Sequence, residues 1–318
     1  MSPDIICARE MLVEIMRAEI GVPHVQVGGV YKGPYPSGAP CIFIDSAARM
    51  AKTRKLTTGF IGTIGNDDFG KVVVDKMKAD GVDCSQVVTL NGLTTGAAFV
   101  QYNKDGSRKF IFAAGAAGAL TEAHIKDAFF KGVKDFHVMG SAMSISPTSK
   151  VAVLKAIDLT IKNGGIVSFD PNLRAEMMPL DQIREMVQPV IKKTKILLPS
   201  GEEAMLLTGD KDAKTACENL LNMGPEVVVL KEAKDGCTVY TRKEAIKVPG
   251  FKVKEIDPTG AGDSFGGAFV VEYLAKAPLK DAARFANAVG ALKVTSFGPM
   301  ALNSREEVEK FIAFQGKL

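Results

Sequence analysis

A glycine-rich stretch at residues 257–269, DPTGAGDSFGGAF, constrains the fold of this chain most strongly. Before it, apolar and polar residues alternate over residues 251–256, which predicts a half-buried strand. After it, Phe265, Phe269 and Tyr273 recur at helical spacing, which predicts a helix. Glycines at such a turn let the backbone approach a ligand closely, and the start of a helix favours an anion such as phosphate.

One carboxylate, Asp263, stands inside this predicted anion site. It would repel a bound phosphate, but it suits a general base that takes a proton from a hydroxyl attacking phosphorus. The alternative is a helix-capping Asp, and the glycine setting favours the base. Two other glycine motifs do not match. No Lys follows as in a P-loop, and the spacing Gly260-x-Gly262-x-x-x-Gly266 differs from the dinucleotide fingerprint.

The stretch Asp257-Pro-Thr-Gly-Ala-Gly-Asp263 resembles the C-terminal signature of the ribokinase-like (PfkB) carbohydrate kinases. The similarity extends from about residue 4 to the C-terminus. The resemblance implies transfer of the γ-phosphate of ATP, with Mg²⁺, to a sugar or nucleoside hydroxyl. It implies that Asp263 is the catalytic base and that the N–H groups of Gly260, Ala261, Gly262 and Asp263 form the anion hole. The implied fold is a ribokinase-like three-layer α/β/α arrangement, with a central, mostly parallel sheet and a small β-sheet lid.

The chain is 46% hydrophobic and can bury a sizeable core; by length it could form two domains, but α/β folds of this size are often single, and we expect one domain over residues 1–318. The net charge of +4 does not indicate nucleic-acid binding. Five isolated Cys and three distant His predict neither a zinc site nor a disulfide framework, and reduced thiols are typical of a cytoplasmic protein. We see no apolar run of about 20 residues and no signal-peptide pattern, so we expect no membrane contact.

Helical and strand patterns alternate from residue 121 onward, which predicts a parallel sheet with helices on both faces. Ligands then gather at the carboxyl ends of the strands. The expected strands cover residues 134–140, 166–170, 195–199 and 226–231, and the expected helices cover residues 148–163, 180–193 and 282–295.

Two groups of polar residues follow these strands. In the first, Asn172 could bind substrate or a phosphate-linked water, and Arg174 could neutralise charge on the moving phosphoryl group. An Asx turn with a surface Arg is the alternative. The sequence Asp170-x-Asn172-x-Arg174 resembles that of relatives acting on ketohexoses and keto-deoxy acids, which places Asp170 in the substrate site as well.

In the second group, Ser200-Gly-Glu-Glu203 resembles the family's Asn-x-x-Glu, which orders Mg²⁺ through water. The alternative is an acidic helix start. The resemblance also places three residues beside ATP. Lys231 would meet phosphate or ribose, unless it is a solvated Lys, and Asn287 and Gly298 correspond to positions near adenine.

Residues 4–16 are predicted to form a strand that runs on into a second one. Arg9 replaces the glycine with which the family's Gly-Glu or Gly-Asp begins, and we expect it to crowd the start of the sugar site. Glu14 matches a sugar-binding Asp of relatives and could accept hydrogen bonds from two hydroxyls, or could be an exposed strand residue. Gly38 begins a helix and would let the sugar lie close to the backbone, and Ile42 replaces an expected Asn.

Residues 94–114 are predicted to form a β-hairpin, which pairs with the strand near Glu14 into a small sheet. By resemblance this sheet, at about residues 12–36 and 93–114, is a lid over the sugar and excludes water that would hydrolyse ATP. Arg108 could reach the substrate from it or remain solvated. Homodimers through the lid and activation by a monovalent cation such as K⁺ near Asp257 are further implications of the family.

We therefore expect an ATP-dependent sugar kinase acting on a ketohexose or on 2-keto-3-deoxygluconate, because the motifs look most like fructokinase, tagatose kinase or 2-keto-3-deoxygluconate kinase. A nucleoside kinase of the same fold is the first alternative. A non-catalytic sugar or nucleotide sensor is the second, and Arg9, Ile42 and Ser200 favour it. The intact Gly-Ala-Gly-Asp263 argues against a sensor, because a binding protein has no use for the base.

Overall fold

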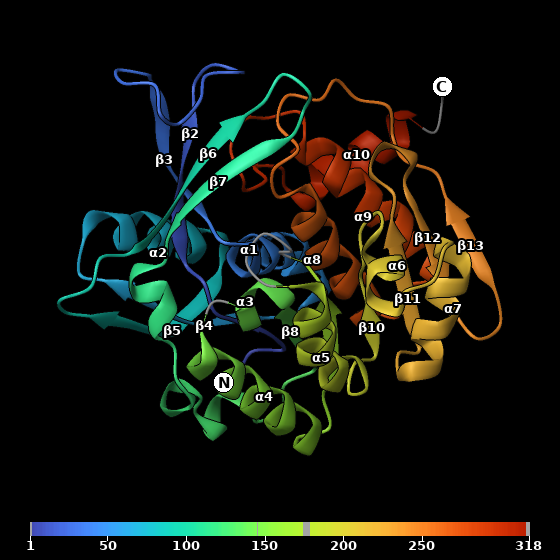
Figure 1. Ribbon diagram of the computed structural model, residues 1–318. Coiled ribbons are helices and arrows are strands. Elements are labelled where there is room, and N and C mark those ends of the chain that lie inside the picture. Colours follow the sequence, from blue (N-terminus) through green and yellow to red (C-terminus); the bar gives the residue numbers. More distant parts are fainter. Residues whose placement is uncertain (1, 145, 174–178, 316–318) are drawn as a thin grey trace.

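A nine-stranded sheet forms the middle layer of the computed structural model, which describes residues 2–144, 146–173 and 179–315 (Figure 1). Neighbouring strands are parallel except at one edge, where the last two strands are antiparallel, so the predicted parallel sheet is confirmed. In spatial order its strands are β13 (Ala245–Val248), β12 (Cys237–Tyr240), β11 (Val227–Lys231), β10 (Ile196–Leu197), β9 (Ile166–Asp170), β8 (Asp135–Met139), β1 (Ile5–Ala8), β4 (Thr58–Gly65) and β5 (Val82–Leu90).

Helices cover both faces of this sheet, as the alternating pattern predicts. One face packs against α1 (Ala39–Ala51), α2 (Asp68–Asp80), α8 (Ala261–Leu274), α9 (Leu279–Lys293) and α10 (Arg305–Gln315). The other packs against α4 (Pro147–Lys162), α5 (Leu180–Ile191), α6 (Glu203–Thr208) and α7 (Ala213–Met223), and the short α3 (Gly140–Ser144) follows β8. Short 3-10 turns lie at Lys52–Arg54, Gly115–Ala119, Glu122–His124, Asp127–Phe130 and Ala233–Asp235. Within these ranges, no helix is both long enough and apolar enough to cross a membrane.

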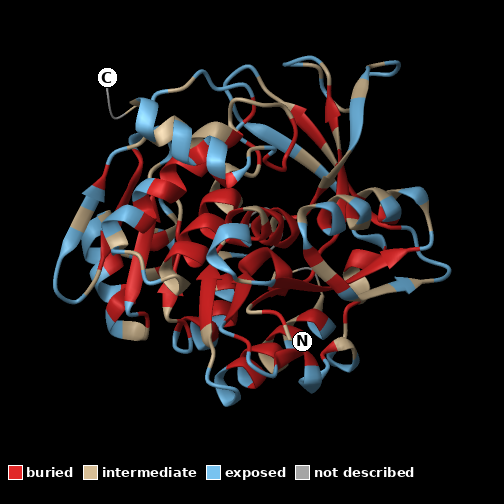
Figure 2. Ribbon diagram, turned by 180° about the vertical axis from the view of Figure 1, so that it is seen from behind, coloured by how far each residue is buried: buried red, intermediate tan, exposed pale blue. Residues whose placement is uncertain are grey.

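Strand β1 shows why both faces need this cover. Side chains of a strand alternate between the two faces of its sheet. Ile5 and Cys7 accordingly enter the core on the α1 and α8 side, while Ile6 and Ala8 enter the core on the α4 and α5 side. Figure 2 shows the resulting buried interior of the three layers. The two cores explain why β1 is continuously apolar.

A second, four-stranded sheet projects from one end of these layers (Figure 1). Its strands, in spatial order, are β3 (Tyr31–Ser37), β2 (Leu12–Arg17), β6 (Gly96–Tyr102) and β7 (Arg108–Ala113). The predicted hairpin is confirmed in β6 and β7, and β2 pairs parallel with β6, so Glu14 lies opposite Ala98. The ribokinase-like three-layer class with a small sheet is therefore confirmed, and this small sheet is mixed in direction.

The predicted strand at residues 251–256 is wrong. Burial alternates over residues 251–254, where Phe251 and Val253 are half-buried and the two lysines are exposed, but Ile256 is exposed and no strand pairs with the segment. Instead the backbone N–H of Ile256 donates to the carbonyl of Val294 just after α9, at 2.7 Å. The glycine turn thus follows an extended segment that is hydrogen-bonded to a helix end.

Candidate active site

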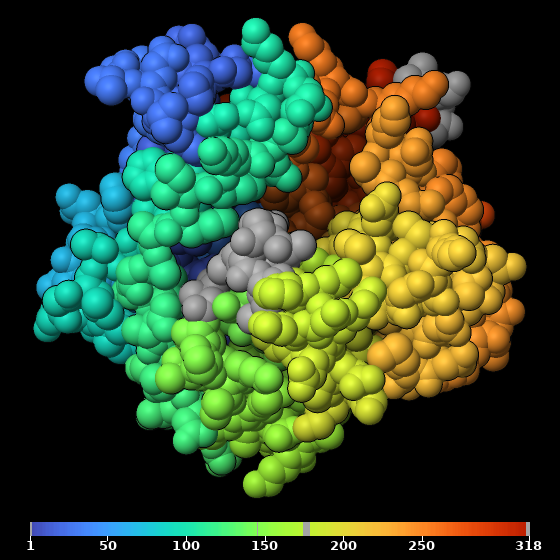
Figure 3. Space-filling view, viewed as in Figure 1, coloured from blue at the N-terminus to red at the C-terminus, as the bar shows by residue number. Residues whose placement is uncertain are grey.

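A cavity of about 340 Å³ opens between the small sheet and the carboxyl ends of the strands of the large sheet. Figure 3 shows the surface hollowed between the small sheet, coloured blue to blue-green, and the orange-brown part of the chain. The predicted site residues that line the cavity are Glu14, Gly38, Arg108, Asp170, Asn172, Glu203, Lys231, Gly260, Gly262 and Asp263. Predicted residues outside its lining are Ala261, Asn287 and Gly298. Arg174 lies outside the described residues.

The glycine turn is the N-terminus of α8. Gly260 is its N-cap residue with φ of +79°, and no side chain caps the helix. Because the first-turn N–H groups of a helix have no partner within it, this end suits an anionic ligand. A Cβ on Gly260 would lie 2.0 Å from the carbonyl oxygen of Pro299 and 3.2 Å from Ile42, so this position requires glycine for space as well as for φ. Asp263 lies in this first turn and lines the cavity.

Lys231 lies beside the glycine turn, since its Nζ is 3.5 Å from where a Cβ on Gly262 would lie. The Lys231 ammonium donates to Oδ2 of Asp170 at 2.5 Å, which joins the end of β11 to the end of β9 across β10. Burial disfavours the charged ammonium, but the carboxylates of Asp170 and Glu203 outweigh it and raise the pKa of Lys231. The predicted alternative of a solvated Lys is therefore wrong, because only 8% of Lys231 is exposed.

Glu203 joins the loops that follow β9 and β10. Its Oε1 accepts the backbone N–H of Leu173 at 2.8 Å, and its Oε2 accepts that of Ser200 at 2.7 Å. Burial raises the pKa of the Glu203 carboxyl, and the nearby negative charge of Asp170 adds to this. In the described ranges, no cluster of three or more His, Cys, Asp or Glu could hold a metal. A magnesium ion held here would take most of its ligands from water and nucleotide.

Two carboxylates from the start of the chain lie at the cavity wall. Oε1 of Glu14 accepts the hydroxyl of Ser37 at 2.8 Å. Glu10, which the sequence analysis did not single out, lines the cavity too, and its Oε1 accepts the hydroxyl of Ser141 at 2.8 Å. The family's Gly-Glu or Gly-Asp opening was the available signal for Glu10, because that carboxylate follows the position of Arg9.

One expectation for this region needs correction, and a second residue has an additional structural reason. Arg9 is not among the cavity-lining residues, so it does not crowd the sugar site. Its effect is on the backbone instead, because this fully buried residue adopts a φ of +120°. Such a φ is unfavourable for a side-chain-bearing residue, which agrees with the glycine that the family resemblance implies at this position. Gly38, at φ of +107°, is required by the protein itself, because a Cβ there would lie 2.3 Å from the carbonyl oxygen of Glu10.

Asn172 and Arg108 approach the cavity from opposite sides. Asn172 adopts φ of +38°, and its backbone N–H donates to Oδ1 of Asp170 at 3.1 Å, so the Asx turn forms. The side-chain oxygen of Asn172 is buried without a hydrogen-bond partner at the cavity wall. Arg108 is exposed, as the alternative predicted, yet its Nη1 reaches Oγ1 of Thr259 at 3.1 Å.

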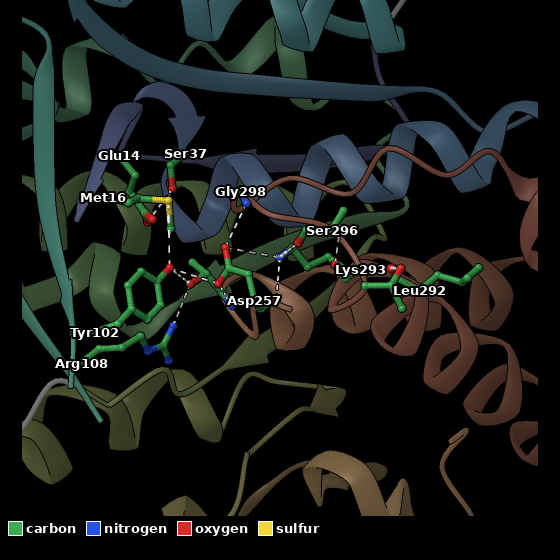
Figure 4. Close-up of polar contacts among 12 residues, drawn as sticks. Glu14, Met16, Ser37, Tyr102, Arg108, Asp257, Leu292, Lys293, Ser296 and Gly298 are labelled. Carbon is green, nitrogen blue, oxygen red and sulfur yellow. Dashed lines mark hydrogen bonds and ion pairs between the residues drawn. The ribbon is translucent and has the colours of Figure 1, made fainter. Parts of the chain in front are cut away.

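The small sheet is hydrogen-bonded to the signature turn through Asp257 (Figure 4). The Tyr102 hydroxyl donates to Oδ1 of Asp257 at 3.1 Å, and the backbone N–H of Thr259 donates to the same oxygen at 3.0 Å. Oδ2 accepts the backbone N–H of Gly298 at 2.9 Å, which accounts for that glycine outside the cavity. Asn287 is likewise occupied elsewhere, since its amide donates to the carbonyls of residues 248 and 249.

An uncapped helix start beside a cavity, with a carboxylate in its first turn and a buried ammonium next to it, is an arrangement suited to phosphoryl transfer to a hydroxyl. The class of protein that fold and site define is a kinase of small molecules.

Comparison with known proteins agrees. The family model of the pfkB family carbohydrate kinases matches residues 41–306. "Probable fructokinase-5" of Arabidopsis thaliana is 31% identical over 99% of both chains. An E. coli crystal structure provisionally designated ribokinase II, in complex with ATP and Mg²⁺, is 38% identical with a TM-score of 0.91, covering 99% of this chain and 100% of that one. A fructokinase from Xylella fastidiosa with bound ATP is 25% identical with a TM-score of 0.83, over 98% of each chain. The chain belongs to the PfkB family of carbohydrate kinases.

Proposed function

We propose that this carbohydrate kinase transfers the γ-phosphate of ATP to a hydroxyl of a ketohexose such as fructose. The observation that carries the proposal is the position of Asp263, at the start of α8 and at the wall of a cavity that Glu10 and Glu14 also line. A sugar is a neutral polyol, and a carboxylate can accept hydrogen bonds from several hydroxyls. The cavity therefore combines groups suited to hold a sugar with a group suited to deprotonate it.

In the proposed step, Asp263 takes the proton of the attacking sugar hydroxyl. The hydroxyl oxygen forms a bond to the γ-phosphorus, and the bond between the γ-phosphorus and the bridging oxygen breaks, so that ADP leaves. The N–H groups of Gly260, Ala261, Gly262 and Asp263 bind the charge on the transferred phosphoryl group. Positioning and electrostatics supply most of the rate, and the base contributes typically ~10²–10⁴-fold. Arg174 is proposed to neutralise charge on the phosphoryl group.

ATP and Mg²⁺ are proposed because the E. coli relative was crystallised with both. Mg²⁺ at this site would supply positive charge that neutralises phosphate. Glu203 would hold it through water, because each of its oxygens keeps a lone pair beyond the backbone N–H that it already accepts. Lys231 is proposed to meet phosphate beside the glycine turn, and Asn287 and Gly298 stay predictions for the adenine side.

The ketohexose is the finer part of the proposal. It is supported by the fructokinases among the relatives, 28–31% identical for the first plant sequences. Alongside Glu10 and Glu14, the residues proposed to contact the sugar are Gly38, Arg108, Asp170 and Asn172. Asn172 contributes a buried amide oxygen without a partner, which a sugar hydroxyl could satisfy. 2-Keto-3-deoxygluconate is the competing substrate.

We also propose that the small sheet, predicted at about residues 12–36 and 93–114, acts as a lid on one kinase domain spanning residues 1–318. Its contact with the signature turn through Tyr102 and Arg108 supports this, because closure would bring sugar, base and anion hole together and exclude water. Homodimerisation through this sheet stays a prediction of the resemblance.

The test is ADP release by the purified protein with Mg²⁺-ATP against fructose, tagatose, ribose, 2-keto-3-deoxygluconate and adenosine. We expect turnover with a ketohexose. Asp263→Asn should lower kcat by ~10²–10⁴-fold, the range of general-base catalysis, while ATP still raises its unfolding temperature as in the wild type.

Each other outcome would change one part of the proposed function. An Asp263→Asn variant with wild-type kcat would remove the base assignment. Turnover with 2-keto-3-deoxygluconate or adenosine alone would replace the ketohexose. ATP stabilisation without turnover on any compound would favour the sensor.

A further inference from the structure

Lys293 is a charged residue that the function proposed above does not use. It is the last residue of α9, and its side chain is fully buried. Its Nζ donates to the backbone carbonyl of Asp257 at 2.9 Å and to that of Ser296 at 3.4 Å, and lies 4.0 Å from Oδ2 of Asp257 (Figure 4). A buried ammonium is costly unless oxygen partners surround it, and here two carbonyls and a carboxylate do so.

The position of this ammonium is significant because Asp257 opens the signature turn. The Asp257 carboxylate accepts hydrogen bonds from Tyr102 of the small sheet, from Thr259 of the turn and from Gly298 after α9. It is itself fully buried, so its negative charge needs a nearby positive one. Lys293 supplies that charge. Burial lowers the pKa of Lys293, and the Asp257 carboxylate opposes this.

The oxygens around Lys293 are of the kind that a monovalent metal cation would use. Backbone carbonyls and a carboxylate are hard oxygen ligands, and a cation among them would join the end of α9 to the signature turn. The resemblance implies such a cation, K⁺, near Asp257. The residues of this chain do not fit it there, because the ammonium of Lys293 already takes two carbonyls and the carboxylate.

We propose that Lys293 is a tethered cation that holds the signature turn in its active geometry, so that this kinase needs no free monovalent cation. This inference rests on the proposed function only where kcat is measured, because the unfolding temperature can be measured without turnover. Lys293 acts here as a positioning residue: it contacts Asp257, and through Asp257 it orients the turn that carries Gly260 and the start of α8. The chain thereby carries its own covalently attached cation.

The first experiment compares the wild type in tetramethylammonium, Na⁺ and K⁺ salts at equal ionic strength. We expect the same kcat and the same unfolding temperature in all three. A several-fold rise of kcat, or a clear rise of unfolding temperature, specific to K⁺ would overturn the proposal. The unfolding temperature is measured without sugar, so this arm stands even if none of the proposed substrates is turned over.

The second experiment compares two variants of Lys293, one that leaves the space of its side chain empty and one that fills it. Lys293→Ala removes the ammonium and opens its site, so in tetramethylammonium we expect kcat to fall about 10²-fold, as for a displaced catalytic turn. K⁺ should restore much of this kcat and raise the unfolding temperature of Lys293→Ala. Lys293→Met fills the space with an uncharged chain, so K⁺ should restore little of it.

An exposed lysine provides the control. Lys310 in α10 pairs with Glu306 and has a 73% exposed side chain, so Lys310→Ala should change neither kcat nor its response to K⁺. Full activity of Lys293→Ala in tetramethylammonium would refute the positioning role. Equal loss in both Lys293 variants without any K⁺ response of kcat or unfolding temperature would show a purely structural lysine. If Lys293→Ala does not fold, the wild-type comparison alone decides cation independence.

Discussion

Replacing Gly260 by Ala tests whether the geometry of the signature turn controls catalysis. Gly260 has φ of +79°, where a side chain costs roughly 1–2 kcal/mol. The new Cβ would also lie 2.0 Å from the carbonyl oxygen of Pro299, whereas ordinary contact begins at 3.4 Å. Backbone must therefore move by roughly 1.4 Å at the start of α8. A shift of about 1 Å in a catalytic group can cost 10²-fold, so kcat should fall by about 10²-fold or more.

Gly164 is the matched control for this change. It has the same φ of +79°, but a Cβ there would meet nothing within 4 Å. Gly164→Ala should therefore lose roughly the same 1–2 kcal/mol of unfolding free energy, because of the unfavourable φ alone, and should keep the wild-type kcat. Urea unfolding gives the stabilities, and ADP release with the active sugar gives kcat and KM. The reasoning is refuted if Gly260→Ala keeps wild-type kcat and is destabilised no more than Gly164→Ala.

Two further predictions concern buried charges. Lys231→Met leaves Asp170 buried without its cation, so the free energy of unfolding should fall by about 3–5 kcal/mol in urea. Adding Asp170→Asn removes the unpaired charge, so the double variant should regain stability but not ADP release. If the double variant is no more stable than Lys231→Met, the ion pair is not the cause. Burial raises the pKa of Asp135 from 3.8 to about 7, so the folded protein binds a proton that the unfolded chain has released between these values. Wild-type stability should therefore fall, relative to Asp135→Asn, by up to about 4 kcal/mol as pH rises from about 4 to about 7, and parallel urea-derived profiles would contradict this.

Local sequence signals predicted the elements well wherever the deciding interactions are local or periodic. A strand is expected at residues 166–170, and β9 is found at Ile166–Asp170. The residues 251–256 show the limit of such signals. Their apolar–polar alternation is matched by alternating burial over residues 251–254 but not at Ile256, which is exposed, and a strand also needs a partner for its backbone groups. Here the end of α9 supplies the acceptor, at Val294, and the sequence pattern carries no information about that neighbour.

The site residues likewise fall into those that are close together in the sequence and those that only the fold brings together. Asp263 and the glycines of the signature turn belong to one short segment, so their grouping could be predicted without the fold. Glu10 and Ser141 are 131 positions apart, and their contact forms because parallel strands β1 and β8 end side by side. The tertiary structure also adds a second reason for Gly38, whose missing side chain makes room for the carbonyl of Glu10.

By itself, the sequence determined the periodic elements, the turn that begins α8 and the family to which these motifs belong, because each depends on residues close together in the chain. Only the tertiary structure decided which distant charges meet. It paired Lys231 with Asp170 across β10, and it brought Lys293 to Asp257 through the packing of α9 against the signature turn. The physical reason is that charge pairing acts through space over a few ångströms, and no spacing along the chain records which side chains folding will bring within that distance.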